Sequence, residues 1–202
     1  MPTFTAALLA AAMSGLAPCH ADVAEGTADV ISDGSFWVMR SLPPALALFG
    51  GEQEERVGRR MLDTGIASGL AAEGLKRLTR QSRPDDPDAE DGFPSGHATA
   101  AWALAEAAGT EDPDLRPYTY AFAAAVTWSR VELKRHTVWQ ALAGSALGYG
   151  VARASASSRK GLFGGLFVEA GGKPASAAFS PGWTEAPSVY ERPMVTLWET
   201  QW

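Results

Sequence analysis

Apolar residues recur at helical spacing over most of the first 160 positions, and polar or Gly/Pro-rich breaks separate these segments. Between residues 52 and 79, apolar side chains fall close to one helical face: Val57, Met61, Ile66, Leu70 and Leu75. Charged residues gather near the start of that segment, as in a surface helix. The pattern predicts helices over 22–40, 52–79, 95–108, 113–128 and 136–156, with a break at Ser41-Leu42-Pro43-Pro44 and a short apolar piece at 45–49. The sequence therefore predicts an all-α fold, a compact helical bundle.

The two ends of the chain differ in amino-acid composition from this helical region. Residues 1 to about 21 combine the apolar run Ala6–Leu16 with small residues at Cys19-His20-Ala21, as in a cleaved signal peptide. This predicts a secreted or periplasmic protein. Lipidation of Cys19 is the alternative, although Pro18 fits such a site poorly. Residues 22–160 form the predicted helical domain, and 161–202 are a Gly/Pro/aromatic-rich, irregular tail with short β-like pieces at 166–168 and 194–198, expected to pack on the domain.

Length, charge and composition limit the kinds of molecule that this protein is expected to bind. The 202 residues suffice for one domain with a core, and the formal net charge of −6 argues against a nucleic-acid binder. Beyond the signal, no stretch has the length to span a bilayer, so a soluble or peripheral protein is expected. The only cysteine is Cys19, so the mature domain has no disulfide. Oligomeric state is not predicted.

An acidic run lies between two of the predicted helices: Asp85, Asp86, Asp88, Glu90 and Asp91. A calcium loop is one interpretation, but the run lacks the ligand spacing and the closing Glu of an EF-hand. We interpret it as a solvated loop whose carboxylates could shield neighbouring arginines, and we predict no metal site.

Two histidines remain after the predicted signal is removed. His97 ends the stretch Gly92-Phe93-Pro94-Ser95-Gly96-His97, and His136 follows Ser129-Arg130 after five residues. Both lie at the start of a predicted helix, where free backbone N–H groups and the helix dipole favour an anion. We therefore expect a phosphate site in which one histidine attacks phosphorus and the other protonates the leaving group.

The remaining groups that a phosphate site needs are also available. Lys76, Arg83 and Arg130 can supply positive charge, and guanidinium groups match phosphate oxygens in a bidentate way. Ser95 and the backbone N–H groups of Gly96 and His97 can complete a cradle at the helix start.

These residues stand in a recognisable order: Lys76, six residues, Arg83-Pro84; then Pro94-Ser95-Gly96-His97; then Ser129-Arg130, five residues, His136. This arrangement resembles the three-part signature of the type 2 phosphatidic acid phosphatase superfamily, from Lys76 to about Gly144. That superfamily includes bacterial non-specific acid phosphatases, membrane lipid phosphatases and vanadium haloperoxidases.

The resemblance implies the helical bundle of the histidine acid phosphatase/haloperoxidase type and assigns roles. His136 would be the nucleophile that forms a phosphohistidine, and His97 the general acid. The phosphate would be bound by Lys76, Arg83, Ser95, Gly96 and Arg130. The expected activity is metal-independent and cofactor-free hydrolysis of phosphate monoesters, with small esters and lipid phosphates both open as substrates.

One position departs from the signature. The family pattern has an Asp four residues after the nucleophilic His, and here that position is Gln140. Its amide oxygen can still accept from the imidazole and orient His136, but it cannot stabilise imidazolium as a carboxylate does. Low activity, a non-catalytic phosphate- or phospholipid-binding protein, and a haloperoxidase with vanadate as its cofactor therefore stay open as alternatives.

Overall fold

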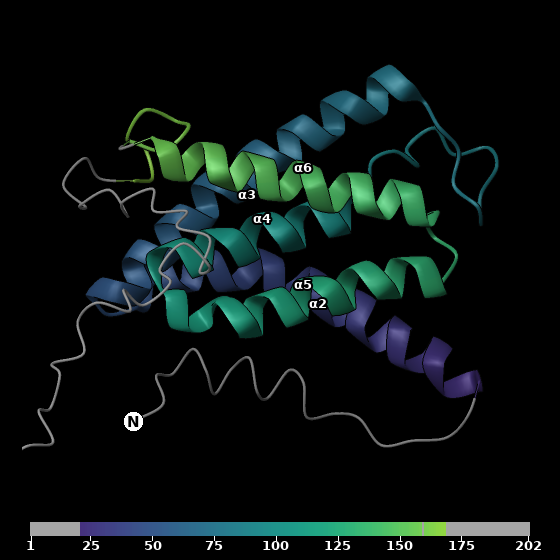
Figure 1. Cartoon of the computed structure of the whole chain (residues 1–202), viewed down its shortest axis with the longest axis horizontal. Coiled ribbons are helices and arrows are strands. Elements are labelled where there is room, and N and C mark those ends of the chain that lie inside the picture. The colour runs from purple at the N-terminus through teal and green to yellow at the C-terminus, as the bar shows by residue number, and fades with distance from the viewer. Residues whose placement is uncertain (1–20, 159, 169–202) are drawn as a thin grey trace, which may run out of the picture.

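The computed structural model describes residues 21–158 and 160–168, and these ranges contain helices and loops but no strand (Figure 1). The α-helices are α2 (Ala21–Phe49), α3 (Glu52–Thr79), α4 (Gly96–Glu111), α5 (Arg116–Glu132) and α6 (Val138–Ser157), and the 3-10 turn η1 spans Pro113–Leu115. The predicted all-α fold is confirmed, and the bounds predicted for α3 are those observed.

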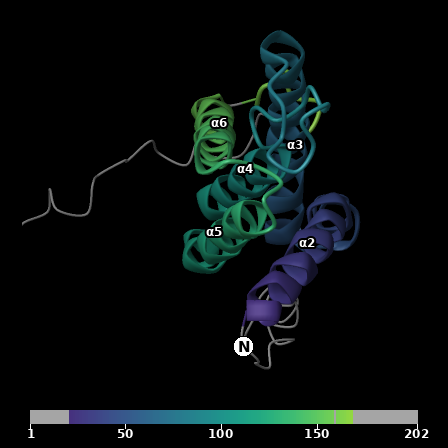
Figure 2. The same cartoon turned by 90° about the vertical axis from the view of Figure 1, so that its right-hand side faces the viewer.

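Helix α4 is the centre of the bundle. It packs against α3, α5 and α6, and Figure 2 shows it between these neighbours. Seven of its 16 residues are alanines, whose small side chains leave room for close approach from several sides. Six of them are buried: Ala98, Ala101, Ala103, Ala105, Ala107 and Ala108. These small side chains allow three helices to pack closely on α4.

The predicted break at residues 41–44 is wrong. Pro43 and Pro44 lie inside α2, which continues to Phe49. Proline removes a backbone donor and usually ends a helix, but here α3 packs directly on the turn. A Cβ at Gly58 of α3 would lie only 2.7 Å from the Pro43 carbonyl oxygen. Tertiary packing therefore outweighs the local preference.

Three other predicted bounds shift. Helix α4 runs through Gly109 to Glu111, and Arg116 packs over Gly109 and donates to its carbonyl at 3.0 Å. Helix α5 reaches Glu132, so the Ser129-Arg130 pair lies in its last turn. Helix α6 begins only at Val138, because Thr137 is its N-cap, and His136 therefore lies just before the helix.

The loop that follows α6 is anchored to α3. The backbone N–H groups of Leu162 and Phe163 donate to the carboxylate of Asp63, which is fully buried. Residues 166–168 form a bend, so the β-like piece predicted there is wrong. The predicted signal peptide, apart from Ala21, and the tail from residue 169 lie outside the described residues. Among the helices described, none combines the length and apolarity needed to cross a membrane.

Candidate active site

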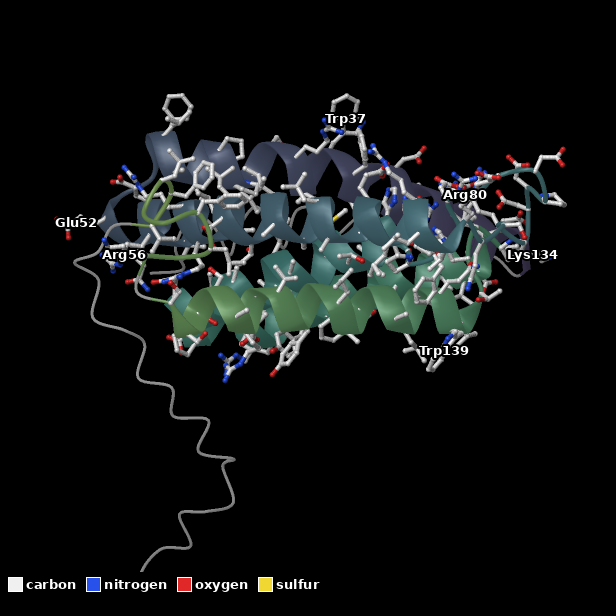
Figure 3. The ribbon with its side chains drawn as sticks, turned by 90° about the horizontal axis from the view of Figure 1, so that it is seen from above. Trp37, Glu52, Arg56, Arg80, Lys134 and Trp139 are labelled. Atoms are coloured by element: carbon white, nitrogen blue, oxygen red, sulfur yellow. The ribbon has the colours of Figure 1, made fainter. Side chains whose placement is uncertain are left out.

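The predicted site residues gather at one end of the bundle, at the right in Figure 1. Lys76 lies in the last turn of α3, and Arg83 in the loop that follows. Gly96 begins α4, Arg130 lies in the last turn of α5, and His136 is in the link to α6. Figure 3 shows Arg80 and Lys134 at this same end.

The acidic loop between α3 and α4 pairs its carboxylates with basic neighbours. Asp91 accepts two hydrogen bonds from the Arg83 guanidinium and lies 3.7 Å from Lys76 Nζ. Arg83 and Lys76 outweigh the effect of burial and hold the pKa of Asp91 below its usual value. Asp85 likewise pairs with Arg135 at 2.7 Å. The predicted shielding of arginines is confirmed. Within the described ranges, no group of three or more acidic, His or Cys side chains could hold a metal ion.

His136 is buried, and its ring is fixed through one nitrogen. Its Nδ1 lies 2.9 Å from the Gly92 carbonyl oxygen. A carbonyl only accepts hydrogen bonds, so Nδ1 carries the proton of the neutral ring and Nε2 keeps a free lone pair. Burial lowers the pKa of His136 to about 4, and Arg130 and Arg83 add to the shift, while the hydrogen bond to Gly92 opposes it.

His97, the second residue of α4, lies among the other charged groups of the site. Burial, followed by the charges of Arg130, His136, Lys76 and Arg83 in that order, lowers its pKa to about 4. All four of these predicted site residues are therefore close enough to act on His97. The Phe36 ring from α2 lies beside the imidazole, with centroids 6.0 Å apart.

Two buried polar atoms at this end have no hydrogen-bond partner among the described residues: Ser95 Oγ and Arg130 Nε. Arg130 is buried, and its Nη1 donates to Ser32 Oγ on α2. Burial also lowers the pKa of Arg130. Because an unpaired buried polar group is costly, the two atoms favour a ligand that accepts hydrogen bonds and carries negative charge.

A pocket of about 370 Å³ opens beside these groups. It is lined by Arg83, His97 and Arg130, together with α2 residues and the α5–α6 link: Asp29, Ser32, Asp33, Phe36, Trp37, Leu133 and Arg135. A second pocket, of about 310 Å³, shares Phe36 and His97 and is mostly apolar; its further lining includes Met39, Pro43, Ile66 and Leu104. A polar and an apolar pocket thus meet at His97.

The Gln140 side chain makes two hydrogen bonds besides the interaction with His136 that was predicted for it. Its Oε1 accepts from the Thr137 N–H at 3.1 Å, and its Nε2 donates to the Ser82 carbonyl at 3.0 Å. The Nδ1 hydrogen bond of the His136 ring goes to Gly92, and a side-chain interaction with Gln140 makes a smaller contribution that also raises the pKa of His136. The Gln140 side chain, which is longer than that of Asp and carries an NH₂ group, therefore caps α6 and ties this helix to the loop at Ser82.

Sequence reasoning missed three contributors to the site. Ser32 belongs to no motif, and Asp91 was grouped with a solvated acidic run. Gly92 stands in the recognised stretch, but a backbone carbonyl has no signature in sequence. Lys76, Arg83, Ser95, Gly96, His97, Arg130 and His136 lie at the same end of the bundle, as predicted.

In the part of the chain that the structure describes, the fold is helical, and one end of the bundle holds two histidines together with Lys76, Arg83 and Arg130. Residues 38–162 match the model of the PAP2 superfamily. The match covers more than half of the chain, and the chain belongs to this superfamily. No curated protein and no solved structure matches it. Most PAP2 proteins are phosphatases and are typically metal-independent, so membership suggests phosphatase-type activity on a phosphate ester.

Proposed function

We propose that this protein hydrolyses phosphate monoesters without a metal, through a phosphohistidine at His136. The observation that carries the proposal is the fixed ring of His136. Its Nδ1 is held by Gly92, which leaves Nε2 unprotonated at the end of the bundle where Arg83, His97 and Arg130 gather. An unprotonated ring nitrogen beside several cations suits attack on a bound phosphoryl group.

The proposed reaction has two steps that use both histidines. In the first, Nε2 of His136 forms a bond to phosphorus as the P–O bond to the leaving group breaks, and His97 gives its proton to the leaving oxygen. In the second, water attacks the phosphohistidine, His97 takes up the water proton, and the N–P bond breaks to release phosphate. A bound phosphoryl group raises the pKa of His97 from its ligand-free value of about 4, because it adds negative charge beside the ring.

We further propose that the leaving group carries an apolar portion. The apolar pocket meets the polar one at His97, the residue that would protonate the leaving oxygen. An ester bound with its phosphate beside Arg130 could extend its apolar group along Met39 and Ile66. This favours amphiphilic phosphate esters over small polar ones.

Hydrolysis of p-nitrophenyl phosphate in the presence of a chelator tests the reaction. We expect activity in the natural protein, a fall of at least about 10³-fold in His136→Ala, and a fall of about 10²- to 10⁴-fold in His97→Ala. Labelled substrate should leave a phosphoryl group on the natural protein that is stable to alkali and lost in acid, and none on His136→Ala. Equal turnover in the natural protein and His136→Ala would refute the assignment of His136 as the nucleophile.

The same preparations separate the alternatives. Binding of inorganic phosphate without turnover would identify a phosphate-binding protein, and halide oxidation on addition of vanadate would identify a haloperoxidase. For the leaving group, a series of n-alkyl phosphates should show kcat/KM rising with chain length. Ile66→Ala alters the apolar pocket and not the polar one, so it should reduce that rise and leave methyl phosphate little changed. A kcat/KM that does not change with chain length would refute the proposal that the leaving group carries an apolar portion.

A further inference from the structure

We propose that the backbone carbonyl of Gly92, held in place by Gln140 through Ser82, orients the nucleophilic His136. Gly92 and Gln140 are then positioning residues for the proposed reaction, and the inference rests on that proposed function. In this chain, a peptide carbonyl would do for the ring what the carboxylate does in the family signature.

The contacts form a chain from α6 to the His136 ring. Gln140 lies in the first turn of α6, and its Nε2 donates to the Ser82 carbonyl at 3.0 Å. The neighbouring Gln81 carbonyl accepts from the Gly92 N–H at 2.6 Å. The Gly92 carbonyl in turn lies 2.9 Å from His136 Nδ1. The Gln140 side chain thus ties the loop segment at residues 81–82 to α6, and this segment holds Gly92 against the His136 ring.

Packing at Gly92 shows how closely these parts meet. A Cβ at this position would lie 2.2 Å from the Ser82 oxygen and 2.9 Å from Gln140 Nε2. Only glycine allows the approach without displacement of the loop. Gly92 is buried, which limits the competition of water for its carbonyl.

A second connection fixes the other side of this turn. The Ser95 N–H donates to the Gln140 backbone carbonyl at 3.1 Å. Gln140 therefore contacts the loop both before and after Gly92, through its side chain at Ser82 and through its backbone at Ser95. Its side chain also completes the cap of α6, where its Oε1 accepts from the Thr137 N–H.

The cap and the tie to Ser82 can be separated by substitution. Gln140→Glu keeps an oxygen for the Thr137 N–H but removes the donor to Ser82 and sets a carboxylate against its carbonyl. Gln140→Met removes the donor without adding charge. Thr137→Ala is the matched control, because it removes the hydroxyl that accepts from the Gln140 N–H and leaves the tie to Ser82 intact.

We expect Gln140→Glu and Gln140→Met to lower kcat at least about tenfold with a smaller effect on the Kd of inorganic phosphate. Thr137→Ala should lower the melting temperature and leave kcat unchanged. If Gln140 instead acted directly on the ring as a weak substitute for a carboxylate, Gln140→Glu would raise kcat and the pKa of His136. A rise of this kind would overturn the proposal.

The tautomer of His136 provides a readout independent of turnover. In protein labelled with ¹⁵N-histidine and assigned with a His97→Asn variant, we expect the Nδ1–H form of His136 in the natural protein. Gln140→Met should shift it toward a mixture with the Nε2–H form, and Thr137→Ala should not. These shifts in a protein without turnover would refute the proposed function but not the positioning. An unchanged tautomer in Gln140→Met would refute the positioning, whatever the activity.

Discussion

Arg130 in the last turn of α5 donates through Nη1 to the hydroxyl of Ser32 on α2, and both side chains are buried. The two residues are 98 positions apart. Ser32 precedes residue 38, where the match to the PAP2 superfamily begins. The part of α2 outside the match therefore supports an arginine of the predicted signature, and it also lines the polar pocket through Asp29 and Phe36.

Ser32→Ala should weaken phosphate binding, because it removes the acceptor that fixes the Arg130 guanidinium. A hydrogen bond to a charged group contributes about 1.5–3 kcal/mol, so we expect the Kd of inorganic phosphate to rise about tenfold or more by calorimetry. Ser35→Ala is the matched control. Ser35 is buried on the same helix, but its hydroxyl donates only to the Ser32 carbonyl at 2.8 Å. Equal Kd values for the two variants would contradict this role of Ser32.

The pH profile of turnover should lie on the acid side. The proposed reaction needs His136 unprotonated and His97 protonated, and both have a pKa of about 4 in the ligand-free protein. Because kcat/KM reports the ionisations of the free enzyme, it should be bell-shaped with its maximum near pH 4. The kcat profile should extend to higher pH, since the bound phosphoryl group raises the pKa of His97. A kcat/KM maximum above pH 7 would contradict this assignment.

Stability should fall as the pH drops from about 6.5 to about 4. In this window, the unfolded chain binds protons on both histidines while the folded chain, with its lowered pKa values, does not. A shift from 6.5 to about 4 corresponds to an upper value of about 3 kcal/mol per histidine. Denaturant unfolding across this pH range measures the loss of stability. His97→Asn should remove the part of this pH dependence that comes from His97.

Sequence patterns predicted most of this architecture, and their failures have physical causes. The periodicity of α3 is strong and local, and its bounds were predicted correctly. The helix through Pro43 and Pro44 depends on α3 packing against that turn, which no local pattern records. The motifs identified side chains that carry charge, such as Arg83 and His97. The Gly92 carbonyl and the Ser32 hydroxyl contribute through position alone, so only the folded chain reveals them.

Because α6 packs closely on α4, alanine substitutions at three glycines of α6 should have different effects on stability. A Cβ at Gly148 would lie 2.0 Å from the Thr99 carbonyl oxygen, and one at Gly144 would lie 2.5 Å from the Ser95 carbonyl oxygen. A Cβ at Gly150 would meet nothing within 4 Å. Gly150→Ala should therefore be neutral or stabilise by up to about 1 kcal/mol through helix propensity, whereas Gly148→Ala should destabilise by about 1–3 kcal/mol through overpacking.

Gly144→Ala should differ from Gly148→Ala in its effect on the site. Both substitutions push α6 away from α4, so both should lower the free energy of unfolding in denaturant titrations. Of the two glycines, only Gly144 faces Ser95, whose hydroxyl has no hydrogen-bond partner among the described residues. Gly144→Ala should therefore also raise the Kd of inorganic phosphate, measured where each variant is fully folded. A Kd that rises equally in Gly148→Ala would mean that the site responds to the spacing of the two helices as a whole, and not to the position of Ser95.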